Sequence, residues 1–337
     1  MNNNLNIQNY NYMEQSFPNG TIIHDYQILG LIGIGGFSEV YRVNSLKFGV
    51  DFAAKVVHLP DYDNETAQDA FEAEIKSLMR LDHPNVIRLY DHFQYFDHFF
   101  LILELCNGGS LTDMVELYGP FSGNKLYALT RQIISAVAYI HSQKIAHHDI
   151  KPQNILFDSY GRPKLLDFGI SINLSKTKVS PDFRYSLPYA PPELLNDHLF
   201  SPYKADFWSL GITLIYAASG ELPYQYYDEK SLRMAIKHGL LSIPPNIDMQ
   251  FYNAIKDLLH YDPNKRITIE ELCVRSQGLT QESSSLNSLI PKRTRNSAPS
   301  LLKRNPLSDR PRIMNRTNHL FSSPISIPTF IEGIPED

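Results

Sequence analysis

The sequence predicts a two-lobed α+β protein, in which a small β-rich lobe precedes a larger helical lobe. The first observation is a series of short apolar strands between residues 26 and 57, interrupted by a glycine-rich turn. The second is a set of segments with helical periodicity at residues 123–142, 204–219 and 248–260. The third is the composition, with 43% hydrophobic and 20% charged residues, which is typical of a globular protein with a core.

Both ends of the chain differ in composition from this central part. Residues 1–22 form an Asn-rich tail with little apolar surface to bury, so we expect disorder. Residues 280–337 are rich in Ser, Pro, Asn and Arg, and their eight Lys or Arg outnumber five Asp or Glu. We expect this basic tail to be disordered as well. The folded domain is therefore placed at residues 26–275.

The bulk properties exclude several classes of protein. A net charge of −5 argues against a protein that binds nucleic acid through its overall charge. Cys106 and Cys273 are too few for a disulfide framework and indicate a reducing compartment. No apolar run reaches the ~20 residues of a membrane span, and the amino terminus lacks a signal-peptide pattern. We expect a soluble monomer in the cytoplasm, with the nucleus as an alternative, and no nucleic-acid or membrane partner.

The first lobe begins as an antiparallel series of strands. Apolar residues predict strands at Tyr26–Leu29, Val40–Val43 and Phe52–Val57, and two more between residues 91 and 105. Between them, residues 64–80 have the periodicity of a helix. Glu74 lies on the apolar stripe of that helix, where a carboxylate needs a partner.

The turn between the first two strands contains Gly33, Gly35 and Gly36, with Phe37 at its tip. Glycine lets backbone N–H groups approach a phosphate without a Cβ atom in the way. A strand follows the turn rather than a helix, which argues against a Rossmann dinucleotide site. The alternative is that these glycines only form a tight turn.

A second polar segment carries the groups that chemistry on a phosphate requires. Asp149 can accept the proton of a hydroxyl, Lys151 can neutralise a phosphoryl group, and Asn154 offers an amide oxygen to a hard cation. The apolar run 155–157 predicts a buried strand that anchors this loop. Asp167 follows another such strand and is a candidate magnesium ligand. The alternative is a polar surface loop.

These motifs, in this order, resemble the eukaryotic protein kinase family, in its serine/threonine branch, over residues 26–275. Residues 147–154 are similar to H-R-D-x-K-x-x-N, with His148 where the family usually has Arg. Residues 33–40 resemble G-x-G-x-x-G-x-V, with Ser38 at the third glycine, and Ala53-Ala54-Lys55 resembles V-A-I-K. Within that branch, the sequence loosely resembles the calcium/calmodulin-dependent kinases.

The resemblance implies a protein kinase fold that uses ATP and Mg²⁺. Asp149, Lys151, Lys55 and Glu74 would be catalytic, with Lys55 and Glu74 forming an ion pair, and Asn154 and Asp167 would hold the metal. The pairs implied as architecture are Glu193 with Arg266, and Asp206 with the loop that contains Asp149. The residues implied for ATP binding are Leu31, Gly33, Gly35, Gly36, Phe37, Ser38, Val40, Ala53, Lys55, Leu103, Glu104, Cys106 and Leu156.

We therefore predict a protein serine/threonine kinase in intracellular signalling, and Lys151 favours that branch. The main alternative is a pseudokinase scaffold, which His148 and Ser38 would support. A small-molecule kinase is disfavoured by the long segment from Asp167 to Glu193. The expected partners are protein substrates and, at Ser297 in an Arg-rich stretch of the tail, a phosphoserine-binding adaptor. The alternative for that stretch is a solvated basic linker.

Overall fold

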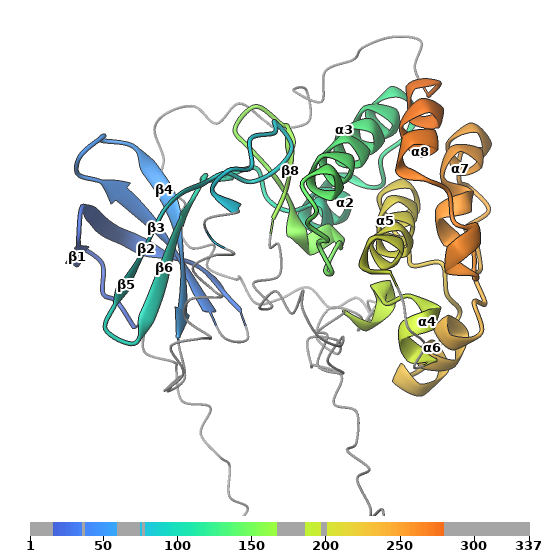
Figure 1. Ribbon diagram of the computed structural model, residues 1–337, viewed down its shortest axis with the longest axis horizontal. Coiled ribbons are helices and arrows are strands. Elements are labelled where there is room, and N and C mark those ends of the chain that lie inside the picture. Colours follow the sequence, from blue (N-terminus) through green and yellow to red (C-terminus); the bar gives the residue numbers. More distant parts are fainter. Residues whose placement is uncertain are drawn as a thin grey trace, which may run out of the picture. The chain divides into compact units, whose positions relative to one another are not determined.

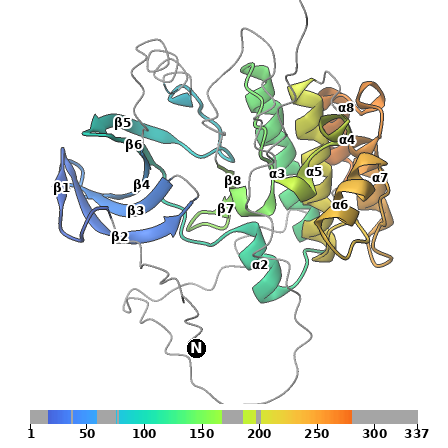
Figure 2. The same cartoon turned by 90° about the horizontal axis from the view of Figure 1, so that it is seen from below.

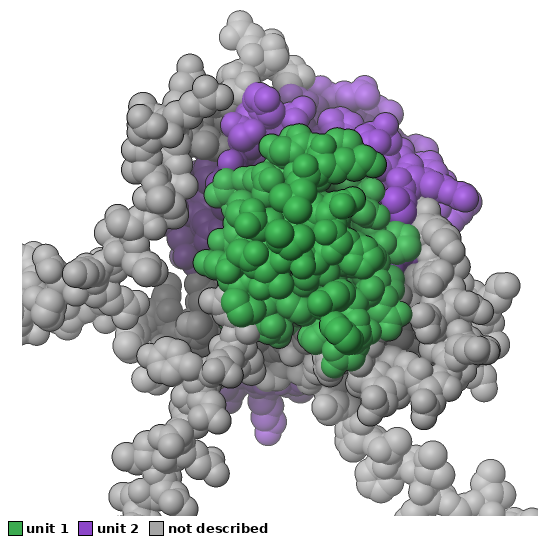
Figure 3. All heavy atoms as spheres, turned by 90° about the vertical axis from the view of Figure 1, so that its left-hand side faces the viewer, with its two compact units in different colours: residues 1–63, 89–105 green, residues 64–88, 106–337 purple. Residues whose placement is uncertain are grey.

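The computed structural model describes residues 16–35, 38–58, 75, 78–166, 186–196 and 201–279. The chain divides into two compact units, coloured separately in Figure 3. Unit 1 contains residues 1–63 and 89–105, and unit 2 contains residues 64–88 and 106–337. The described part of unit 1 is a β-sheet and that of unit 2 is mainly helical, which confirms the predicted α+β class.

Unit 1 is an antiparallel sheet of six strands in the order β1-β2-β3-β4-β6-β5 (Figure 1). The three predicted strands that begin at Tyr26, Val40 and Phe52 are present and are longer than expected, because flanking residues continue the hydrogen-bonded ladder. These added residues are polar in the second and third strands, whereas residues 30–34 extend the first. The strand bounds are β1 (Ile22–Ile23), β2 (Tyr26–Ile34), β3 (Ser38–Ser45), β4 (Asp51–His58), β5 (Leu89–Tyr95) and β6 (His98–Leu103).

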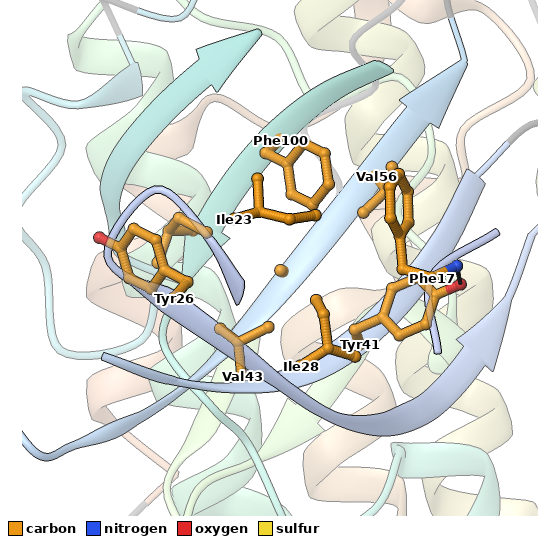
Figure 4. Close-up of a cluster of buried hydrophobic side chains, with 10 residues drawn as sticks. Phe17, Ile23, Tyr26, Ile28, Tyr41, Val43, Val56 and Phe100 are labelled. Atoms are coloured by element: carbon orange, nitrogen blue, oxygen red, sulfur yellow. Dashed lines mark hydrogen bonds between the residues drawn. The ribbon is translucent and has the colours of Figure 1, made fainter. Parts of the chain in front are cut away.

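One face of this sheet carries a buried aromatic and aliphatic cluster, shown in Figure 4. Alternation along β3 and β4 places Tyr41, Val43, Ala54 and Val56 on this face. Phe17 also belongs to the cluster, with only 8% of its surface exposed. The disorder expected for residues 1–22 is wrong at Phe17, because its ring packs into the core of unit 1.

Unit 2 is built around two long helices, α3 and α5, which contact each other. The predicted helix at 123–142 is α3, and the one predicted at 204–219 begins two residues earlier, because Pro202 suits the first turn of a helix. Gly220 ends α5 in a left-handed conformation, with φ of 78°. The helix bounds are α2 (Leu111–Tyr118), α3 (Gly123–Ser142), α4 (Pro192–Leu195), α5 (Pro202–Ser219), α6 (Glu229–Lys237), α7 (Met249–Ile255) and α8 (Ile269–Gln277).

A two-stranded hairpin, β7 (Ile155–Phe157) and β8 (Pro163–Leu165), packs against α2 and α3 in unit 2 (Figure 2). Of the helix expected at residues 64–80, the described Ile75 and Leu78 are helical and buried, whereas Met79 and Arg80 form a turn, so the helix ends earlier than expected. The helix expected at 248–260 consists of α7 followed by a 3₁₀ turn over Lys256–Leu259. None of the helices in the described ranges combines the length and hydropathy needed to cross a bilayer.

Candidate active site

The loop formed by residues 147–154, here called the Asp149 loop, is held at its end by the β7–β8 hairpin. Pro152 begins a 3₁₀ turn that runs through Asn154, and its fixed φ suits the first position of that turn. The chain then enters β7, where Ile155 and Phe157 are buried. The polar loop therefore ends on a rigid apolar anchor.

Three side chains converge on the carboxylate of Asp149. Lys151 Nζ lies 2.7 Å from Asp149 Oδ2, and Asn154 Nδ2 donates to the same oxygen at 2.9 Å. Ser186 Oγ donates to Asp149 Oδ1 at 3.1 Å and accepts a hydrogen bond from Lys151 Nζ at 2.7 Å. The side chains of Asp149 and Lys151 are 22% and 21% exposed. The carboxylate is thus oriented by neighbours and still reachable from solvent.

Ser186 was not among the predicted site residues. It belongs to a different segment of the chain, 37 residues beyond Asp149, and begins the 3₁₀ turn Leu187–Tyr189. The available signal in the sequence was a hydroxyl seven residues before Glu193. Its contact with both Asp149 and Lys151 makes it a candidate positioning residue.

Asn154 has the orientation that a metal ligand would need. Its Nδ2 donates to the main-chain oxygen of Asp149 at 2.8 Å as well as to the carboxylate. Two acceptors around the nitrogen fix the amide and leave Oδ1 as the atom available to a cation. Within the described residues, no three His, Cys, Asp or Glu side chains are arranged to hold a metal ion. Asp167, the other predicted ligand, lies outside those residues.

His147 links the Asp149 loop to the end of β8. Its Nδ1 accepts a hydrogen bond from the Asp149 N–H at 3.2 Å, so the ring proton lies on Nε2. Nε2 then donates to the Leu166 carbonyl at 2.6 Å. A fully buried, neutral imidazole therefore fixes the backbone immediately before and at Asp149.

Asp206, fully buried in α5, accepts hydrogen bonds from the backbone of the same loop and braces it. It accepts hydrogen bonds from the N–H groups of His147 and His148 at 2.7 and 2.8 Å, and from His141 Nε2 at 2.8 Å. Burial acts to raise the pKa of Asp206, but the hydrogen bond from His141 and the nearby histidines outweigh it and the pKa falls. The brace expected from the sequence is present and ionised.

His148 has a left-handed backbone, with φ of 67°, which is unfavourable for a residue with a Cβ atom. Its hydrogen bond to Asp206 holds it in that conformation. Burial lowers the pKa of His148, so the imidazole is neutral near pH 7. It does not supply the permanent positive charge that an arginine would have at this position.

Glu193 and Arg266 form the expected buried ion pair. Arg266 donates to both carboxylate oxygens at 2.7 and 2.6 Å, and Arg266 Nε donates to the His260 carbonyl at 2.9 Å. The side chain of Arg266 is 0% exposed and that of Glu193 is 3% exposed. This bidentate pair ties α4 to the segment before α8 and has an architectural role.

In unit 1, the strand register brings five of the predicted nucleotide residues to one face of the sheet. Val40 pairs with both Gly33 and Lys55, and Ala53 pairs with Leu103. Directly paired residues, and residues two apart on a strand, point to the same side. The face that carries Gly33, Val40, Ala53, Lys55 and Leu103, here called the Lys55 face, is opposite the buried cluster.

Leu31 does not lie on the Lys55 face. It pairs with Tyr41 and packs against the buried cluster, because a β-bulge between Leu31 and Gly33 shifts the alternation of β2. This corrects its assignment to the nucleotide site. Ile32, at the bulge, is 52% exposed and is the candidate in its place.

Of the remaining predicted nucleotide residues, some belong to unit 1, some belong to unit 2, and others are outside the described residues. Gly35 and Ser38 close the turn, since Gly35 N–H donates to the Ser38 carbonyl at 2.6 Å. Glu104 follows β6 in unit 1, whereas Cys106 and Leu156 belong to unit 2. Gly36, Phe37, Glu74 and Asp167 are not among the described residues.

Comparison with known proteins gives a consistent assignment. Residues 26–276 match the protein kinase domain family. The chain is 33% identical over 262 residues to a probable myosin light chain kinase of Dictyostelium discoideum, covering 76% of this chain and 54% of that protein. It is 32% identical over 247 residues to sperm motility kinase 2A of Mus musculus, covering 73% and 48% respectively. The chain thus spans about half the length of these curated relatives.

Proposed function

Because the chain belongs to the protein kinase family, we propose that it is an active enzyme, which transfers the γ-phosphoryl group of ATP to Ser or Thr hydroxyls of protein substrates. The observation that carries this proposal is the convergence of Lys151, Asn154 and Ser186 on the Asp149 carboxylate. A scaffold that only binds partners would not need a carboxylate whose two oxygens are both oriented.

Phosphoryl transfer depends mainly on positioning and on stabilising charge, since the protein does little covalent chemistry. Asp149 orients the substrate hydroxyl and accepts its proton as the oxygen attacks the γ-phosphorus. Lys151, held between Asp149 and Ser186, places a positive charge beside the group in transfer. His147 and Asp206 keep the backbone of the loop from moving when the proton arrives.

The nucleotide is assigned to the Lys55 face of unit 1. Val40, Ala53 and Leu103 would contact the adenine, with Ile32 replacing Leu31. Lys55 would bind the phosphates and pair with Glu74, and the backbone of the turn at Gly33 and Gly35 would approach them. The other residues proposed to contact ATP are Gly36, Phe37, Ser38, Glu104, Cys106 and Leu156.

Magnesium would neutralise the charge of the ATP phosphates when bound, and the residues proposed to hold it are Asn154 and Asp167. The described part of the site fits this role, because the Asn154 amide oxygen remains available after both hydrogen bonds of its nitrogen are made.

The second candidate function is a pseudokinase scaffold that binds nucleotide or partners without turnover. Two specific observations favour it, namely the neutral His148 where the family usually has Arg, and Ser38 in place of the third glycine of the turn. Neither residue removes a group that the proposed mechanism requires. We therefore place this function second.

Transfer of labelled γ-phosphate to a positional-scanning peptide library, with and without Mg²⁺, tests the proposal. Magnesium-dependent labelling of Ser and Thr peptides is the expected result. Since one relative's name gives myosin light chain as its substrate, that protein belongs among the substrates tested. Labelling of Tyr peptides would contradict the serine/threonine assignment. Nucleotide binding without any transfer would support the scaffold.

We also propose that the chain acts in intracellular signalling as a monomer in the cytoplasm, and that Ser297 is a regulatory site. Phosphorylation there would add a dianion for an arginine cluster of an adaptor protein. Loss of adaptor capture in a Ser297→Ala variant is expected. If the variant captures the same adaptor as wild type, the segment is only a basic linker.

A further inference from the structure

Residues 16–21 lie ahead of the region matched by the kinase family, and they pack on the sheet of unit 1. The Phe17 ring contacts the rings of His98, Phe100 and Tyr41, with centroids 5.1, 5.3 and 6.0 Å away. Figure 4 shows Phe17 beside Tyr41 at one end of the buried cluster, with Tyr26 at the other end. This segment is therefore anchored by an aromatic side chain.

A chain of hydrogen bonds leads from this anchor to the start of β3. The Phe17 N–H donates to the Tyr41 hydroxyl at 3.2 Å, and that hydroxyl donates to Glu39 Oε2 at 2.6 Å. Burial and then the bond to Glu39 raise the pKa of Tyr41 to about 12, so the hydroxyl keeps its proton. The anchor thus reaches the residue that follows Ser38 in the glycine-rich turn.

The same segment is also bonded to β2, the other strand that leaves the turn. Gly20 N–H donates to the Ile28 carbonyl at 2.8 Å, and Ile28 N–H donates to the Thr21 carbonyl at 2.8 Å. Glu39 is paired with Ile34, across the base of the turn. One short segment therefore contacts both strands of the hairpin whose turn is proposed to bind the phosphates.

We propose that residues 16–21 position the glycine-rich turn for nucleotide, with Phe17 and Tyr41 acting on it through Glu39. The inference rests on the proposed assignment of nucleotide to the Lys55 face. A glycine-rich turn loses more conformational entropy on ordering than other turns do. Residues 16–21 contact both strands that flank the turn and so restrict its conformations before ATP binds. The turn then loses less conformational entropy on binding, and ATP binds more tightly.

The test compares Tyr41→Phe, which removes one hydroxyl and keeps the buried ring, with Phe17→Ala, which removes the anchor. Phe48→Ala is the matched control, because Phe48 is a 65% exposed phenylalanine of the same unit outside the buried cluster. The readouts are the Kd of a non-hydrolysable ATP analogue with Mg²⁺, the amide exchange of residues 33–40, and Tm. KM for ATP and kcat are measured separately.

Tyr41→Phe removes both the hydrogen bond from Phe17 and the one to Glu39, and the bond to Glu39 is the link to the turn. It is therefore expected to weaken analogue binding about two- to tenfold and to speed amide exchange in residues 33–40. KM for ATP should rise while kcat stays unchanged. The double variant should bind no more weakly than Phe17→Ala alone, because both changes interrupt one chain of contacts. Phe48→Ala should match wild type in Kd and amide exchange.

Unchanged Kd and amide exchange in both variants would overturn the inference and leave the proposed function intact, because wild type still binds the analogue. A fall in Tm without a change in Kd would also overturn it, since Phe17 would then serve only stability. A wild-type protein that binds no analogue would instead contradict the proposed function.

Discussion

Replacing Asp206 by Asn tests whether the hydrogen bonds from the backbone of the Asp149 loop to Asp206 position the reacting groups. The substitution keeps the size of the side chain but exchanges one acceptor oxygen for an NH₂ group. Asp206 accepts three hydrogen bonds in a fully buried site, two of them from consecutive backbone N–H groups. The NH₂ group cannot accept, so at least one of the donors from His147 and His148 loses its partner.

The expected cost follows from these contacts. A hydrogen bond to a charged acceptor contributes about 1.5–3 kcal/mol, and an unpaired buried donor adds a desolvation penalty. We therefore expect a loss of about 3–5 kcal/mol in the free energy of unfolding, the range for a broken buried charged network. His148 would then relax from its left-handed backbone and displace Asp149. A loss of about 1.4 kcal/mol in the transition state alone lowers kcat tenfold.

Asp158→Asn provides a matched control. Asp158 is also buried, at 3% exposure, and accepts three hydrogen bonds, from the Tyr160 and Arg162 N–H groups and from Arg162 Nε. Urea unfolding should show that both variants lose stability, whereas peptide phosphorylation should show that only Asp206→Asn loses kcat. A folded Asp206→Asn protein with wild-type kcat would refute the positioning argument.

Three further outcomes are expected. Ser186→Ala should lower kcat about tenfold and Ser186→Thr should restore it, since a hydroxyl between Asp149 and Lys151 is what counts; equal activity of all three forms would contradict this. Phosphatase treatment should leave activity unchanged, because neutral His148 provides no guanidinium to bind a phosphate; a large loss, reversed by rephosphorylation, would contradict it. A peptide library should show no dominant Arg three residues before the phosphorylated residue. Kinases that select such an Arg commonly have acidic residues at the positions of Ser110, Gln153 and Tyr216, and none of these three carries a charge.

The sequence was sufficient where local periodicity decides the structure. The helix at 123–142 was predicted with its observed bounds, since its apolar stripe spans five turns. The Asp149 loop was also predicted, because Asp149, Lys151 and Asn154 are close in sequence. The 3₁₀ turn over Pro152–Asn154 brings the Asn154 amide back to Asp149.

One feature could not be predicted because it depends on strand register. The bulge at Leu31–Gly33 moves Leu31 to the buried face, and a shift of one residue reverses the side on which a strand residue lies. Residues of β2 therefore need the observed pairing before they can be assigned to a face.

Two others depend on tertiary contacts. Phe17 lies in a polar, Asn-rich context, and only the aromatic pocket on the sheet explains its burial. Ser186 reaches Asp149 from 37 residues away through packing that no local pattern encodes.

The central claim is that Asp149 accepts the substrate proton in an active kinase. Single-turnover transfer from ATP to the best library peptide, compared between wild type and Asp149→Asn, tests it most directly, with the Kd of an ATP analogue measured for both proteins. We predict a loss of about 10²–10⁴-fold in the rate of transfer, the usual contribution of a general base, with an unchanged Kd. Transfer at the wild-type rate by a folded Asp149→Asn protein would contradict the account.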